Sequence, residues 1–220
     1  MSGGESQGFA IIERIEAGEP VDRIADALGL GPSGFFAALA EAGFELGGGP
    51  GLIRGRTRAG GLAGALDDPT MARLLPGSTR AARLALAAGV LQVFDHWEAS
   101  HEAAQEAEEL GEKRTSAYWH GIAHRREPDP GNAAYWFRKV GRHPILPAIG
   151  VAAAAILREL PNDPDSDRLV GGGAWNPSAF VDVCSRAKPG TKAEALARRL
   201  QKVEMLALVG ASVEAAGGGQ

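Results

Sequence analysis

The chain has 220 residues, of which 45% are hydrophobic, 23% charged and only 6% aromatic. This composition is typical of a folded protein with a sizeable core. The net charge of -4 argues against a general electrostatic attraction to nucleic acid. The single cysteine, Cys184, excludes an internal disulfide and a zinc site built on cysteines.

Membrane insertion and secretion are also disfavoured by the sequence. The longest apolar run, residues 145–157, is too short to cross a bilayer and contains Pro147. Residues 1–8 are polar and lack the basic region of a secretory signal. We therefore predict a cytoplasmic protein with no membrane or nucleic-acid partner. High alanine content with few aromatic residues favours an all-α fold.

Residues 1–46 form a small acidic segment with the pattern of three short helices. Apolar residues recur at helical spacing and are interrupted at residues 18–20 and 29–33, as in a helix-turn-helix. The second helix of that pair, residues 34–43, contains no Arg, Lys, Asn or Gln to read base edges. We therefore interpret this segment as a small bundle or a partner-docking module.

Residues 47–77 follow as a glycine-rich linker and connection. Seven glycines lie within residues 46–61, and so many glycines disfavour a helix because of their backbone entropy. We expect a solvated linker here, then a helical domain over residues 78–216 and a disordered tail at 217–220.

The helical domain is predicted to contain seven helices. Apolar periodicity supports each helix, and Thr115 or Ser116, Asn176 and Thr191 are candidate caps. Pro128 and Pro130 end the third helix. The predicted ranges are 79–94, 96–110, 115 to before 128, 132–140, 145–160, 176–186 and 191–215.

Part of this domain resembles a tetratricopeptide repeat. The chain matches itself modestly at a shift of 34 residues, which is that repeat's period. In residues 117–145, Gly121 stands where two helices approach closely, Phe137 stands on a core face, and Pro144 follows. His124 departs from the pattern, because an aromatic residue is usual there. The resemblance implies stacked antiparallel helical hairpins.

A second resemblance covers about a quarter of the chain. Its motif consists of Tyr118-Trp119-His120, His124-Arg125-Arg126-Glu127, Asn132, Tyr135-Trp136-Phe137-Arg138 and His143-Pro144. This motif resembles the core of an uncharacterised bacterial protein family. The resemblance implies a domain boundary and no mechanism.

All five histidines lie between residues 96 and 143. His120, His124 and Glu127 follow one another at helical spacing, which puts them on one helix face. Two imidazoles and a carboxylate suit Zn²⁺, Mn²⁺ or Fe²⁺ with a position left open for water. Asp95 and His101, in the preceding hairpin, are candidates to complete this site.

The same residues suit chemistry without a metal. A histidine beside a carboxylate is a general acid–base pair near neutral pH. An anionic substrate would be held by nearby arginines through bidentate contacts. We name six candidate substrate-binding residues: Arg125, Arg126, Arg138, Trp119, Tyr135 and His143.

Two functions remain open at this point. The first is a ligand- or protein-binding helical domain whose pocket is lined by residues 95–143. The alternative is a metal-dependent or His/Glu acid–base enzyme acting on a small anionic substrate. A purely structural use of these histidines, as hydrogen-bonded packing groups, is the third interpretation. The sequence does not identify the ligand or the partner.

Overall fold

The computed structural model describes residues 3–159 and 164–217. These residues form thirteen α-helices and one 3-10 turn, with no strand among them, which confirms the predicted all-α fold. Among the described helices, none combines the length and the apolar character that a bilayer crossing requires. The predicted tail lies outside the described residues from residue 218 onward.

The first 75 residues contain the three predicted helices and two more short ones. Helix α2 matches the predicted range and ends at Gly29, whose φ of 65° favours glycine. The short helix α5 was not predicted; Asp67 caps it by accepting a hydrogen bond from the Thr70 amide. The elements are α1 (Gly3–Glu16), α2 (Val21–Leu28), α3 (Pro32–Glu45), η1 (Leu46–Gly48), α4 (Leu62–Ala65) and α5 (Asp68–Leu74).

The remaining helices follow the predicted order, with α11 as an addition. Thr79, Asp129, Asn176 and Thr191 each cap a helix through a side-chain oxygen. Neither predicted cap of α8 has this role, because the Glu112 carboxylate accepts from the backbone at the start of that helix. The helices are α6 (Arg80–Val93), α7 (Trp97–Glu109), α8 (Thr115–Arg126), α9 (Pro130–Val140), α10 (Leu146–Leu157), α11 (Ser166–Val170), α12 (Pro177–Arg186) and α13 (Lys192–Ala215).

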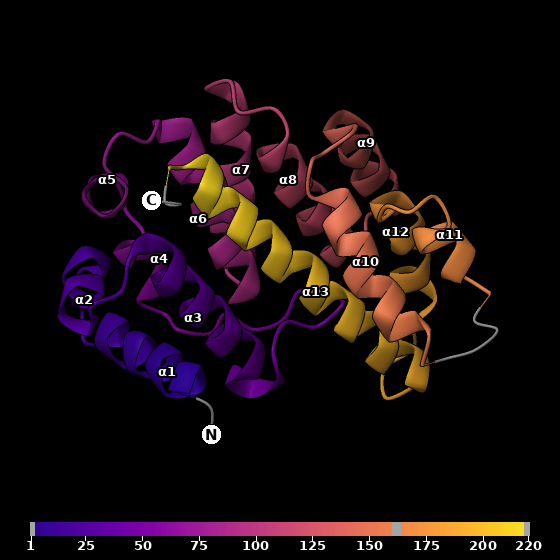
Figure 1. Cartoon of the computed structure of the whole chain (residues 1–220), viewed down its shortest axis with the longest axis horizontal. Helices are drawn as coiled ribbons and strands as arrows, with labels where there is room; N and C mark the ends of the chain where they lie inside the picture. The colour runs from indigo at the N-terminus through magenta and orange to yellow at the C-terminus, as the bar shows by residue number, and fades with distance from the viewer. Residues whose placement is uncertain (1–2, 160–163, 218–220) are drawn as a thin grey trace.

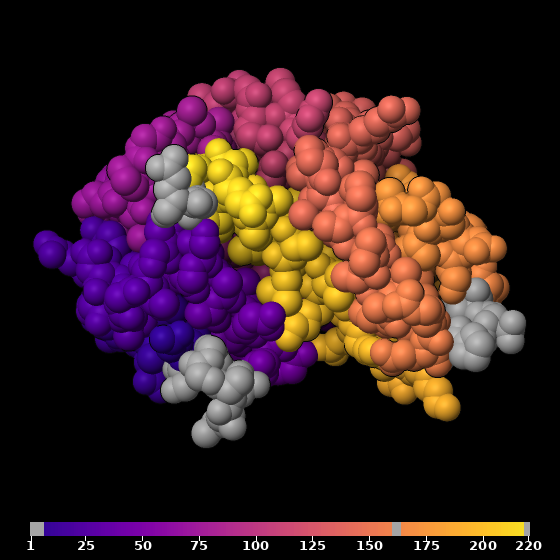
Figure 2. Space-filling model, in the orientation of Figure 1, coloured from indigo at the N-terminus to yellow at the C-terminus, as the bar shows by residue number. Residues whose placement is uncertain are grey.

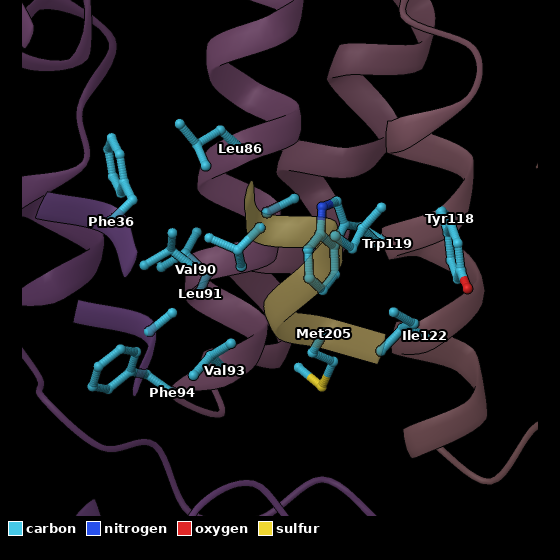
Figure 3. Close-up of a cluster of buried hydrophobic side chains, with 14 of the residues drawn as sticks. Phe36, Leu86, Val90, Leu91, Val93, Phe94, Tyr118, Trp119, Ile122 and Met205 are labelled. Atoms are coloured by element: carbon cyan, nitrogen blue, oxygen red, sulfur yellow. The ribbon is translucent and has the colours of Figure 1, made fainter. Parts of the chain in front are cut away.

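Helices α6 to α9 each pack on their neighbour in sequence, as stacked helical hairpins do (Figure 1). The long helix α13 crosses this stack and contacts α3, α6 and α10. Figure 3 shows the Trp119 ring of α8 among side chains of α6, against α13. A Cβ atom at Gly89 would overlap that ring, so the absence of a side chain there permits the contact. The tetratricopeptide-like character of the stack remains a prediction.

The expected linker packs against the helices instead of extending into solvent. We call residues 49–61 the strap. Leu52 of the strap is buried, and the Arg54 amide donates to the Arg126 carbonyl at 2.7 Å. The Arg58 guanidinium donates to three backbone carbonyls and to the Asp95 carboxylate. Glycine content alone indicated flexibility, whereas these few anchoring side chains bind the segment in place.

Candidate metal centre

Three of the five histidines converge between α7 and α8. His120 and His124 are one turn apart on α8, and His101 faces them from α7. One ring nitrogen from each histidine lies within 4.8 Å of those of the other two. The closest pair is His101 Nε2 and His120 Nε2, which are 2.9 Å apart. The structure thus brings together three predicted site residues from two adjacent helices.

Glu127 orients the third imidazole of this cluster. Its Oε2 lies 2.9 Å from His124 Nδ1, an arrangement in which the ring donates its N–H to the carboxylate. Nε2 of His124 then carries a lone pair, which the Asn132 amide nitrogen approaches at 3.0 Å. In this tautomer Nε2, which the Asn132 side chain contacts in the structure, is the nitrogen that a metal ion would bind.

Two tryptophans stack on the histidine rings. Trp136 lies parallel to His120 with ring centroids 3.7 Å apart, and Trp97 stacks on His101 at 5.1 Å. The Trp97 indole N–H donates to the Ala123 carbonyl at 2.8 Å, which ties α7 to α8. Neither Trp97 nor Trp136 was among the predicted site residues. The signal for Trp97 was its position four residues before His101, on the same helix face.

Burial favours the neutral form of two of these imidazoles, His101 and His120. His120 and His124 are 3% and 6% exposed, whereas His101 is half-buried. Loss of solvation lowers the pKa of His120 to about 3, and the nearby His101, His124 and Lys139 add to the effect. Burial is also the main cause of the lowered pKa of His101. Neutral imidazoles are the form that coordinates metal ions.

Glu127 lies beside the three-histidine cluster and not within it. Its carboxylate forms a second group, with His124 and Asp129, in which the possible ligand atoms lie within 4.8 Å of one another. Asp129 already serves as the cap of α9 by accepting from the Asn132 amide at 3.0 Å. Of the predicted metal ligands His120, His124 and Glu127, the first two lie in the cluster. His101 takes the third position, and Glu127 lies behind His124.

Arg125, Arg126 and Asp95 are placed elsewhere by buried ion pairs. Arg125 Nη2 lies 2.6 Å from Glu204 Oε2, and both side chains are wholly buried. The two groups are close enough for an ion pair but are not aligned for a hydrogen bond, and Glu204 Oε2 has no hydrogen-bond partner among the described residues. Arg126 binds the Asp95 carboxylate. These charges neutralise one another within the fold, so none of the three residues lines the histidine cluster as the sequence analysis expected.

The other predicted binding residues occupy separate environments. Trp119 is buried in the core, and its indole N–H donates to Ser212 Oγ at 3.1 Å. His143 is 7% exposed and lies near Thr115. Arg138 is exposed, and Tyr135 is 47% exposed with its ring edge against Trp136. Their roles in binding remain predictions.

The cluster has the donor set of a transition-metal site. Three imidazoles suit Zn²⁺ and Fe²⁺, whereas Mn²⁺ prefers oxygen ligands. The half-buried His101 marks the more accessible side of the cluster. Comparison of the chain with protein-family models, with curated proteins and with solved structures found no match.

Proposed function

We propose that this protein binds a divalent transition-metal ion through His101, His120 and His124, and that these three nitrogen ligands favour Zn²⁺ or Fe²⁺ over Mn²⁺. The observation that carries the proposal is the convergence of three ring nitrogens within 4.8 Å. Metal–nitrogen bonds of about 2.0–2.1 Å in a tetrahedral site place the nitrogens about 3.3 Å apart. The His101–His120 contact of 2.9 Å would have to widen slightly to accept an ion.

The surroundings of the cluster support this assignment. Glu127 favours the His124 tautomer in which Nε2 carries the lone pair, which is the usual arrangement of a carboxylate behind a metal-bound histidine. Trp136 and Trp97 stack on the other two rings and restrict their rotation. Preorganised rings lose little conformational freedom on binding an ion.

The ion would keep a position for a further ligand. Three protein ligands leave the fourth site of a tetrahedral ion to water or to a small anion. His101 is half-buried, so the accessible side of the cluster lies toward α7. We therefore infer that the domain binds a small anionic ligand at this open position. Any reaction of that ligand would use the ion as a Lewis acid.

Acid–base chemistry without an ion is the less favoured candidate. His101 Nε2 and His120 Nε2 are at hydrogen-bond distance, so one ring donates an N–H to the other and the two rings hold each other's nitrogens in this contact. A general base works best when its pKa lies near the working pH. The pKa of His120 is lowered to about 3, which makes it a weak base at neutral pH.

Metal content of the untagged protein tests the proposal. We expect one equivalent of transition metal after titration, measured by plasma mass spectrometry and calorimetry. His101→Ala, His120→Ala and His124→Ala should each weaken binding by more than about 100-fold, because loss of an outer-shell partner alone costs about 10- to 100-fold. Glu127→Gln should weaken it by that smaller factor.

His143→Ala is the matched control, since His143 lies in the same histidine-rich segment but outside the cluster. Circular dichroism on every variant separates lost binding from lost folding. A wild-type protein that binds none of the three ions would refute the proposal. Wild-type affinity in all three cluster variants would refute it as well.

A further inference from the structure

Helix α10 has an exposed apolar face. All of its twelve residues are apolar, including glycine and proline, and a helix that is apolar all round is normally buried. Val151 is nevertheless 72% exposed. We call its exposed residues the α10 ridge: Pro147, Ala148, Val151, Ala152 and Ala155. Arg142 and Arg158, both exposed, lie beyond the two ends of this ridge.

A complementary groove runs between α3 and α13. It has a volume of about 350 Å³ and is lined by Ala37 and Ala40 of α3 and by Leu206, Val209 and Val213 of α13. Gly210, also in the lining, is exposed, and a Cβ atom there would meet nothing within 4 Å. The groove is therefore shallow, apolar and open to a helix that carries small side chains.

Acidic residues mark the two ends of this groove. Glu41 lies at one end, where it forms a 2.8 Å ion pair with Lys202 of α13. Glu214 lies at the other end and is exposed. From Lys202 to Glu214 the helix rises about 18 Å, at about 1.5 Å per residue. Helix α10 has twelve residues and is also about 18 Å long by the same rise, so the ridge and the groove match in length.

The ridge and the groove belong to the same side of the molecule. Helix α13 contacts α3 and α10. In Figures 1 and 2, these three helices lie on the side facing the viewer, with α3 and α10 on opposite sides of α13. A two-fold axis lying in the plane of this face would bring the ridge of one molecule over the groove of another, and the reverse contact would form at the same time.

We propose that a second copy of this chain covers this face, with the α10 ridge of each copy in the α3–α13 groove of the other. The small residues of the ridge allow close approach of the helices. An arginine at the end of the ridge meets Glu214, which has no ion-pair partner among the described residues, whereas Glu41 is already paired with Lys202. The two contacts close on themselves, so the assembly stops at a dimer and does not extend into a filament.

The mass of the full chain in solution tests this dimer. Sedimentation equilibrium should give about twice the monomer mass of 22.8 kDa as the concentration rises. Val151→Lys and Gly210→Lys should each weaken association by at least 10-fold, because each puts a charge into an apolar contact. Both positions are exposed, so the fold should be retained, and thermal unfolding checks this.

Ile53→Lys is the matched control, because Ile53 is 57% exposed but belongs to the strap and not to the ridge or the groove. This variant should dimerise as the wild type does. Glu214→Arg should weaken the dimer, and a second change, Arg142→Glu or Arg158→Glu, should restore it. A monomer at all concentrations would overturn the proposal. So would undiminished association of Val151→Lys and Gly210→Lys, or failure of both double variants to recover the dimer.

Discussion

At the scale of single residues, the five histidines differ in what their ring nitrogens contact. His96 Nε2 lies 2.9 and 3.0 Å from two strap carbonyls, those of Arg58 and Ala59. His143 Nδ1 accepts from the Ile145 amide at 3.3 Å. His120 Nδ1, in contrast, has no hydrogen-bond partner among the described residues. Helical spacing alone does not separate packing histidines from candidate ligands, because the distinction depends on these local partners.

His143 should make stability depend on pH. Burial is the main cause of its lowered pKa, which the nearby Arg114 lowers further and Glu112 opposes. The unfolded chain therefore binds a proton more readily than the folded one. The contribution of neutral His143 is complete above its unfolded pKa of about 6.5, and it is lost as the pH falls below that value.

Urea unfolding between pH 7.5 and pH 5 measures this effect. One such group changes the free energy of unfolding by at most about 1.4 kcal/mol per pH unit. His143→Gln should show a shallower loss of stability on acidification than the wild type. An unchanged pH dependence in the variant would contradict the assignment.

At the scale of elements, Arg58 fastens the strap to two helix ends. Its guanidinium donates to the Gly43 carbonyl in α3 at 2.6 Å and to the Val93 carbonyl in α6 at 2.5 Å. These carbonyls lie in last turns, where intrahelical partners are missing. Asp95 follows α6 and has a φ of 63°. Its carboxylate accepts hydrogen bonds from the Arg58 guanidinium and from the Gly55 amide. The strap thus satisfies polar groups that the helices leave unpaired.

Arg58→Ala should destabilise the protein by about 3 kcal/mol, since it leaves buried carbonyls and part of the Asp95 charge without a donor. Arg56→Ala, an exposed neighbour in the strap, should change stability by less than about 0.5 kcal/mol. Denaturant unfolding of both variants gives the comparison. Equal, small effects would show that the strap contributes little to the fold.

At the scale of the whole molecule, Glu204 joins distant segments. Its carboxylate lies in the buried part of α13 and accepts from the Tyr118 hydroxyl of α8 at 3.1 Å, 86 residues away in sequence. The Trp175 indole N–H donates to it at 2.8 Å. The Arg125 guanidinium provides the opposite charge and stacks over Phe180 of α12 at 4.6 Å. This network orients α8, which carries two of the cluster histidines.

Glu204→Gln should cost about 3–5 kcal/mol of stability, because Arg125 then becomes a buried charge without a counter-ion. Glu159→Gln is the matched control: Glu159 pairs with Arg199 at 2.7 Å on the surface, where such a pair is worth about 1 kcal/mol or less. Urea unfolding should show a much larger loss in the free energy of unfolding for Glu204→Gln than for Glu159→Gln. Similar small losses would mean that the Arg125–Glu204 pair is not essential to the fold.

Local sequence predicted the helices and their order well. The ranges of α2, α6 and α12 follow from caps, turn residues and apolar periodicity, all of which act within a few residues. The same local rule placed His120 and His124 on one face of α8. It could not detect α5 and α11, whose short ranges provide little periodicity.

The partners of Arg125 and Arg126 were decided by tertiary structure alone. Arg125 and Arg126 are adjacent in sequence, yet one pairs with Glu204 of α13 and the other with Asp95 after α6. Residues that adjoin in a helix point in different directions, and each one's partner depends on which distant segment packs on that side. The sequence by itself therefore determined most of the helices and the position of His120 and His124 on one face of α8. Only the packing of α7 against α8 brought His101 to them, and only the packing of α13 and of the residues after α6 against α8 gave Arg125 and Arg126 their partners.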